Sequence, residues 1–145
     1  MRIWPLNIVI VLLVACGGGS DVEDGVNSFD NSEFTGEYQH QDSYSTWSLK
    51  INRNTIGIER SCLFDRGNVL RQTSTTVSAI YSQPDVSLLE IQITKTSEYQ
   101  SSDEFYECSI PSVYEGEVYL LDQVNSNKYV LKRDTGEVFK SFEKL

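Results

Sequence analysis

Histidine is nearly absent from this chain, which contains a single one, His40, among 145 residues. Hydrolase triads use a histidine base, and zinc sites built from imidazoles need more than one of them. The sequence also lacks HExxH, GxSxG and CxxC motifs and a glycine-rich phosphate loop. We therefore expect His40 to be a surface residue at the end of the first strand, and we expect no enzyme activity, no cofactor and no bound metal.

Positive charge and long apolar runs are scarce as well. The chain has 12 Lys and Arg against 21 Asp and Glu, and its net charge is −9. This balance leaves no basic surface for nucleic acid, which we exclude as a partner. The apolar run from Ile8 to Val14 is much shorter than the roughly 20 residues that a membrane-spanning helix needs. We do not expect a permanent transmembrane helix.

The beginning of the chain has the layout of a secretory signal peptide, with a positive start at Arg2, a short apolar run and a small residue before Cys16. Leu13-Val14-Ala15-Cys16 resembles the lipobox of bacterial lipoproteins. The resemblance implies that residues 1–15 are removed and that Cys16 is acylated, which would anchor the protein in a membrane. The alternative is an ordinary cleavable signal with an incidental cysteine.

The residue after Cys16 is Gly17 and not Asp. In bacterial lipoproteins, Asp at that position favours retention in the inner membrane. The resemblance therefore implies an outer-membrane location, facing either the periplasm or the cell surface. Residues 16–33 are rich in Gly, Ser, Asn and Asp, and we expect them to form a flexible acidic tether because they can bury little apolar surface. Residues 34–145 then form a single domain.

The three cysteines are an odd number for an exported protein. Lipidation of Cys16 would account for one of them and leave Cys62 and Cys108 as a pair. In an oxidising compartment we expect these two to form a disulfide. The bridge would close a loop of about 47 residues and contribute about 4 kcal/mol in the chain-entropy model. Two buried free thiols are the alternative.

Apolar residues alternate with polar ones along most of the domain, as they do in half-buried strands. Turn-forming residues interrupt this pattern, at 52–54, at Gln83-Pro84-Asp85, at 125–127 and at 134–136. The expected strands contain Trp47, Leu49 and Ile51; Ile56 and Ile58; Val77, Ala79 and Tyr81; Leu89, Ile91 and Ile93; Tyr106, Cys108 and Ile110; residues 118–124; and residues 129–133.

The pattern predicts an all-β domain, a small antiparallel meander of about eight strands that forms a barrel or a sandwich. Phe34-Thr35-Gly36-Glu37-Tyr38 resembles the opening strand of lipocalin-like domains, with Tyr38 in the place of their tryptophan. The last segment is ambiguous because Val138, Phe142 and Leu145 have helical spacing. We favour a final strand there, since Thr135-Gly136 suits a hairpin turn, and keep a short C-terminal helix as the alternative.

Acidic residues gather at 101–107 and at Glu115-Gly116-Glu117, but without the spacing of a calcium loop. Eight tyrosines and Trp47 could line a binding surface or serve as half-buried strand residues. We expect a non-enzymatic binding or accessory lipoprotein with a periplasmic or outer-membrane protein as its partner. An envelope enzyme acting on sugar or peptide is the alternative. A further one is a lysozyme inhibitor, a family that Tyr106-Glu107-Cys108 and Asn127-Lys128-Tyr129 faintly resemble.

Overall fold

Strands are the regular secondary structure in the described part of this protein. The computed structural model describes residues 33–64, 69–96, 99–102 and 107–145. Within these ranges no helix is long and apolar enough to cross a membrane. The expected all-β class is confirmed. The strands are β1 (Gly36–Gln41), β2 (Ser45–Ile51), β3 (Thr55–Phe64), β4 (Val69–Asp85), β5 (Leu88–Lys95), β6 (Tyr99–Ser101), β7 (Val118–Gln123), β8 (Lys128–Arg133) and β9 (Val138–Lys144).

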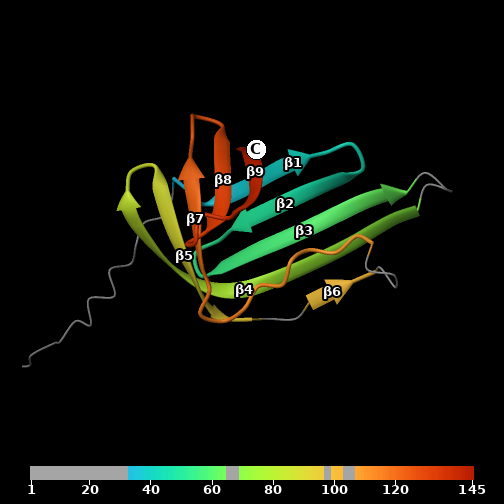
Figure 1. The fold of residues 1–145 in the computed structure, drawn as a ribbon, viewed down its shortest axis with the longest axis horizontal. Coiled ribbons are helices and arrows are strands. Elements are labelled where there is room, and N and C mark those ends of the chain that lie inside the picture. Colours follow the sequence, from blue (N-terminus) through green and yellow to red (C-terminus); the bar gives the residue numbers. More distant parts are fainter. Residues whose placement is uncertain (1–32, 65–68, 97–98, 103–106) are drawn as a thin grey trace, which may run out of the picture.

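Eight of these strands close into an antiparallel barrel, shown in Figure 1. Neighbours pair in the order β1, β2, β3, β4, β5, β7, β8 and β9, and β9 returns to β1. Strands β7 and β8 run across the direction of β2 and β3 (Figure 1), so the wall of the barrel bends sharply between its two halves. Of the two architectures that the sequence left open, the barrel is the one formed.

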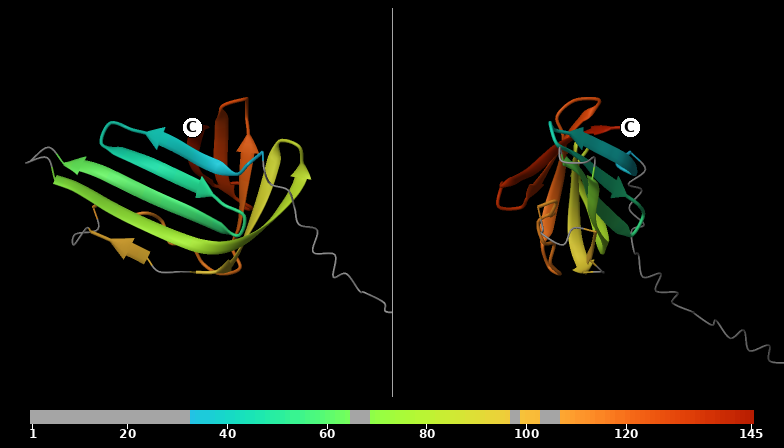
Figure 2. Two further views of the ribbon diagram at one scale, coloured as in Figure 1. Left: turned by 180° about the vertical axis from the view of Figure 1, so that it is seen from behind. Right: turned by 90° about the vertical axis from the view of Figure 1, so that its right-hand side faces the viewer.

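Strand β4 carries this bend. One of its edges pairs with β3 along residues 69–78, and the other pairs with β5 along residues 78–85. The short strand β6 pairs with residues 73–75, next to the stretch that β5 occupies. Strands β3 and β4 extend past the ends of β1 and β2 as a long hairpin, drawn in green in Figure 2. A single strand therefore belongs to both halves of the barrel.

The turn that the sequence predicts at Gln83-Pro84-Asp85 is misplaced, because β4 continues to Asp85 and the chain turns at residues 86–87. The register with β5 shifts between Ser82 and Asp85. Proline lacks the N–H group of a regular ladder and is tolerated in strands at such irregular positions. Pro84 therefore marks a bulge near the end of the strand.

The centre of the barrel is apolar and includes a buried tyrosine hydroxyl. Tyr38 donates a hydrogen bond of 2.5 Å to the carbonyl of Phe34, and its ring meets that of Tyr129 edge-on. Burial raises the pKa of the Tyr38 phenol, which therefore stays neutral and keeps its donor. Other buried core residues are Leu49, Ile51, Ile56, Ile58, Val77, Leu89, Ile91, Ile93, Tyr119, Leu121, Leu131 and Phe142.

The expected disulfide between Cys62 and Cys108 is confirmed, with their Cα atoms 5.8 Å apart. Both cysteines are buried. The sequence pattern suggested a strand through Cys108, but residues 107–117 have turns and irregular backbone instead. Ile110 and Val113 of this segment are nonetheless buried. The disulfide thus ties an irregular segment to the end of β3.

The last segment is the strand β9, and the alternative of a C-terminal helix is wrong. Phe142 is buried, whereas Val138 and Leu145 are 60% and 75% exposed. A helix would have placed all three on one face. Between Leu131 and Lys132 the register of β8 with β9 shifts, so the alternation of inward and outward side chains changes phase after Val138.

Removing the disulfide should destabilise the barrel strongly. We expect replacement of both Cys62 and Cys108 by serine to lower the free energy of unfolding by up to about 4 kcal/mol, because the unfolded chain regains the entropy of the open loop. Denaturant unfolding with and without reductant measures this. As a control, Cys16→Ala should keep the effect of the reductant. Equal unfolding midpoints with and without reductant would contradict a structural role.

Candidate functional site

The shortest join in the barrel wall lies between β1 and β9. Its register consists of the pairs Tyr38↔Lys144 and Gln39↔Glu143, whereas each other neighbouring pair in the wall has five or more. Next to it, the backbone N–H of Leu145 donates to the carbonyl of Glu37 at 3.0 Å. Past Gln39 the two strands separate, and a cavity of about 440 Å³ opens between them. We call this cavity the seam groove.

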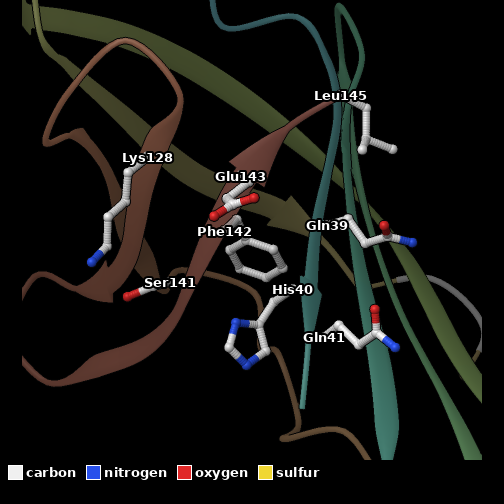
Figure 3. Close-up of a pocket in the computed structure, with 8 residues that line it drawn as sticks. All are labelled: Gln39, His40, Gln41, Lys128, Ser141, Phe142, Glu143 and Leu145. Carbon is white, nitrogen blue, oxygen red and sulfur yellow. The ribbon is translucent and has the colours of Figure 1, made fainter.

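The seam groove has a mixed polar and aromatic lining. Figure 3 shows the imidazole of His40, on β1, beside the ring of Phe142, on β9, while the side chains of Gln39 and Gln41 point away from β9. His40 was expected on the surface but is half-buried here. Such a lining suits a ligand that carries both polar and apolar groups. The groove is lined by Gln39, His40, Gln41, Lys128, Ser141, Phe142, Glu143 and Leu145.

His40 also begins a row of side chains that crosses the sheet. In register, His40 lies opposite Trp47, Trp47 opposite Arg60, and Arg60 opposite Thr73. Directly opposed residues share one face of a sheet, so these side chains are neighbours inside the barrel. Thr73 is fully buried, and its hydroxyl shares a hydrogen bond of 3.0 Å with Ser101 on β6. The interior is therefore polar at the level where β1 leaves β9.

Trp47 is the centre of this polar level and is only 6% exposed. The guanidinium carbon of Arg60 lies 4.9 Å from its ring centroid, and the ammonium of Lys140 lies 4.8 Å from it. The indole Nε1 atom is buried and has no hydrogen-bond partner among the described residues. A buried donor without a partner costs about 1–3 kcal/mol. We call Trp47, Arg60 and Lys140 the basic indole site.

Arg60 is held in place from two sides. Its Nε donates to the hydroxyl of Ser45 at 3.3 Å, and its Nη1 donates to the carbonyl of Ser109 at 3.0 Å. Ser45 in turn donates to both carboxylate oxygens of Asp42. The backbone N–H groups of Tyr44 and Ser45 also donate to Asp42. The hydrogen bond from Tyr44, with those from Ser45, lowers the pKa of Asp42 to about 2, so this carboxylate is ionised at neutral pH.

The structure describes only some of the residues that the sequence singled out. Cys16 and the expected signal peptide and most of the tether lie outside the described residues, as does part of the acidic run at 101–107. Glu117, from the second acidic run, accepts hydrogen bonds from the Tyr119 hydroxyl at 2.8 Å and the Tyr114 N–H at 2.9 Å. Burial of the Tyr119 hydroxyl, and to a smaller degree its hydrogen bond to Glu117, raises the pKa of Tyr119 to about 12. Glu117 thus has a structural partner.

Metal binding has no support within the part of the chain that the structure describes. No group of three or more His, Cys, Asp and Glu side chains there is arranged to hold an ion. Some of the described acidic residues pair with nearby cations instead, as Asp122 does with Lys132 at 3.0 Å.

Arg60 and Lys140 are functional candidates that sequence reasoning missed. Arg60 follows Ile56 and Ile58 at intervals of two, so continuing the alternation would have placed it inside the barrel. Lys140 lies two residues before the buried Phe142, and the shift of register in β9 lies on its other side, between Val138 and Lys140, so alternation read back from Phe142 also places Lys140 inside the barrel. A charged residue at an inward position was the available signal for both.

Comparisons with protein families, with curated proteins and with solved structures gave no match.

The carboxylate of Asp42 should stabilise the folded protein in a pH-dependent way. Its folded pKa of about 2 lies below the ordinary 3.8, so its stabilisation is complete above pH 4 or so and is lost as the pH falls toward 2. We expect Asp42→Asn to lower the thermal midpoint at neutral pH and to match wild type near pH 2. Melting curves across this range measure the difference. A pH-independent difference, or the same behaviour in the control Asp134→Asn, would contradict this assignment.

Proposed function

We propose that this protein is a lipid-anchored component of the bacterial envelope that binds a ligand or a partner protein at the seam groove and does not itself catalyse a reaction. The observation that carries the binding role is the opening of about 440 Å³ in an otherwise paired barrel wall. The lipobox resemblance at Leu13-Val14-Ala15-Cys16 supports the anchor and the outer-membrane location.

The position of the groove favours recognition. Its lining comes from β1 and β9, two strands from opposite ends of the domain sequence that are held together by a short register. A ligand between them would contact both strands, with His40 and Phe142 as the polar and the aromatic contact. Concave sites with an aromatic wall and a few placed polar groups are typical of binding proteins.

The state of the carboxylates supports binding over catalysis. A general acid at neutral pH needs a carboxyl group whose pKa is raised by burial or by a like charge. Backbone hydrogen bonds instead lower the pKa of Asp42 and of Asp85, the latter mainly through the N–H of Ser87. Asp42 lies in the turn between β1 and β2, and Asp85 is the last residue of β4, where accepting these hydrogen bonds from the following residues is a structural task.

Crosslinking from the rim of the groove tests the binding role. We expect a photoreactive benzophenone amino acid at Gln41 to form an adduct of defined mass in intact cells of the producing bacterium. Gln41 is exposed at the rim of the groove, so the large probe is tolerated there and can turn from the outer face of β1 toward an occupant. The same probe at Val86, which is 80% exposed in the β4–β5 turn, is the matched control.

Blocking the groove sharpens this test. His40→Trp places a larger side chain in the groove and should abolish the adduct formed from Gln41. Adduct formation of equal yield from Gln41 and Val86, or an adduct that persists in His40→Trp, would count against the groove as the binding site. Absence of any adduct would count against it too.

The anchor is tested separately by metabolic labelling with a clickable fatty acid. Wild type should incorporate the label, and Cys16→Ala should lose it completely, because the sulfur and the new amino group of Cys16 are the acylated positions in lipoproteins. Labelling of the Cys16→Ala protein would disprove the anchor. Mass spectrometry of the mature chain shows in the same samples whether cleavage precedes Cys16.

A further inference from the structure

The buried indole nitrogen of Trp47 is the most unusual polar group among the described residues, since it is the one buried side-chain nitrogen or oxygen there without a partner. Trp47 is 94% shielded by its neighbours, being only 6% exposed. An indole N–H can only donate, so an acceptor is the group that would satisfy it. The surroundings of the ring show which kind of acceptor this is.

We infer that the basic indole site binds an oxyanion, the carboxylate or phosphate group of a ligand, which accepts from Trp47 Nε1 in the field of the Arg60 and Lys140 cations. The inference rests on the proposed binding function and deepens it. Two cationic groups lie within 5 Å of the ring centroid, at 4.9 Å for Arg60 and 4.8 Å for Lys140. In a chain of net charge −9, this concentrates positive charge at one place inside the barrel.

Arg60 is preorganised for such a ligand. The Ser45 hydroxyl accepts a hydrogen bond from Nε, and the Ser109 carbonyl accepts one from Nη1. These bonds fix the plane of the guanidinium against the indole. Neither of these acceptors is a carboxylate, so the positive charge of Arg60 is not neutralised by a direct ion pair with them. Fixed guanidinium groups are strong partners for carboxylate and phosphate oxygens.

Lys140 supplies the second charge from the opposite side of the seam, because it belongs to β9 and Trp47 to β2. Its side chain is half-buried and faces inward, opposite the buried Leu131. The exposed carboxylate of Asp42, in the turn between β1 and β2, attracts Lys140. The carboxylate of Asp42 is already engaged by the N–H groups of Tyr44 and Ser45 and by the Ser45 hydroxyl. An external oxyanion would therefore complement Lys140 without displacing these bonds.

The seam groove provides access to this site. His40 lines the groove and lies directly opposite Trp47 in the register of β1 with β2. A ligand whose body occupies the groove would thus bring an acidic group to the indole one strand away. Because Nε1 itself is buried, side chains around the indole have to shift when the anion arrives.

Nuclear magnetic resonance of the indole N–H tests the inference. The full chain, labelled with ¹⁵N in its tryptophans, is titrated separately with sodium phosphate and sodium acetate at constant ionic strength, and Trp47→Phe assigns the resonance of Trp47. We expect a saturable shift of this resonance with at least one anion. A response to phosphate alone identifies a phosphate site, and a response to acetate alone identifies a carboxylate site.

Variants of the cation provide the specificity control. Lys140→Met should weaken anion binding about tenfold or more, because it removes a charge-assisted contact. Lys140→Arg should retain binding, and Lys132→Met, on the outer surface of β8, should leave it unchanged. The backbone amide spectrum of each variant reports whether the barrel is folded. A resonance that neither anion moves, or equal affinities for Lys140→Met and Lys132→Met, would overturn the inference.

The two proposals fail separately. If the crosslink from Gln41 forms and is lost in His40→Trp while neither anion shifts the indole resonance, the groove binds a ligand but the oxyanion assignment is wrong. If the anions bind and no crosslink forms, the basic indole site stands on its own and the groove is not the route to a larger ligand. If neither experiment gives a signal, both proposals are wrong.

Discussion

The backbone ladder along β4 is the constraint on which the rest of the structure depends. This strand pairs with β3 over residues 69–78 and with β5 over residues 78–85, and it bends where one partner gives way to the other. The two halves of the barrel are thereby set across each other (Figure 1). Sheets that cross in this way pair along the whole of the shared strand but touch only at a corner on the far side. The short register between β1 and β9 is that corner, and the seam groove follows from it.

The interior is stabilised differently at its two ends. Around Tyr38, Leu49 and Ile91 the barrel is filled by apolar side chains, and burial of their surface drives folding. At the level of Trp47 and Arg60 the side chains are polar or charged, and burial alone contributes less there. At this level the disulfide and the hydrogen bonds that Arg60 donates to Ser45 and Ser109 stabilise the structure in place of apolar burial. Polar groups held by such fixed partners are preorganised for binding.

Much of the fold follows from local pattern. The alternation around Trp47 and Leu49 predicts β2, and the cysteine count predicts the Cys62–Cys108 bridge, because both depend on short-range periodicity or simple arithmetic. Barrel closure depends on pairing between β1 and β9, more than a hundred residues apart in the chain, which no local signal encodes. The sequence accordingly left barrel and sandwich open. The lipid anchor at Cys16 stays a prediction.

The candidate site was hidden from the sequence for a related reason. Arg60 and Lys140 belong to strands that the sequence did identify, yet their meeting at Trp47 requires the register of β2 with β3 and the bulge in β9. Bulges change which face a residue occupies, and they are set by tertiary fit as much as by composition. His40 is a single histidine with no motif around it in the sequence. Its position in the groove depends on the pairing of β1 with β9.

The place where the chain enters the barrel has a mechanical consequence. Glu33 leads into β1, and this entry is held by the end of β9, where the Lys144 ammonium binds the Glu33 carbonyl and the N–H of Leu145 donates to the carbonyl of Glu37. A pull on the chain ahead of Glu33 would therefore load β1 at the corner where the fewest residue pairs join the wall. Such a load would act first on the contacts of Glu33 and Glu37 with the end of β9, which lie beside the groove. With the anchor proposed at Cys16, tension on the chain and occupancy of the groove would act on the same few hydrogen bonds between β1 and the end of β9.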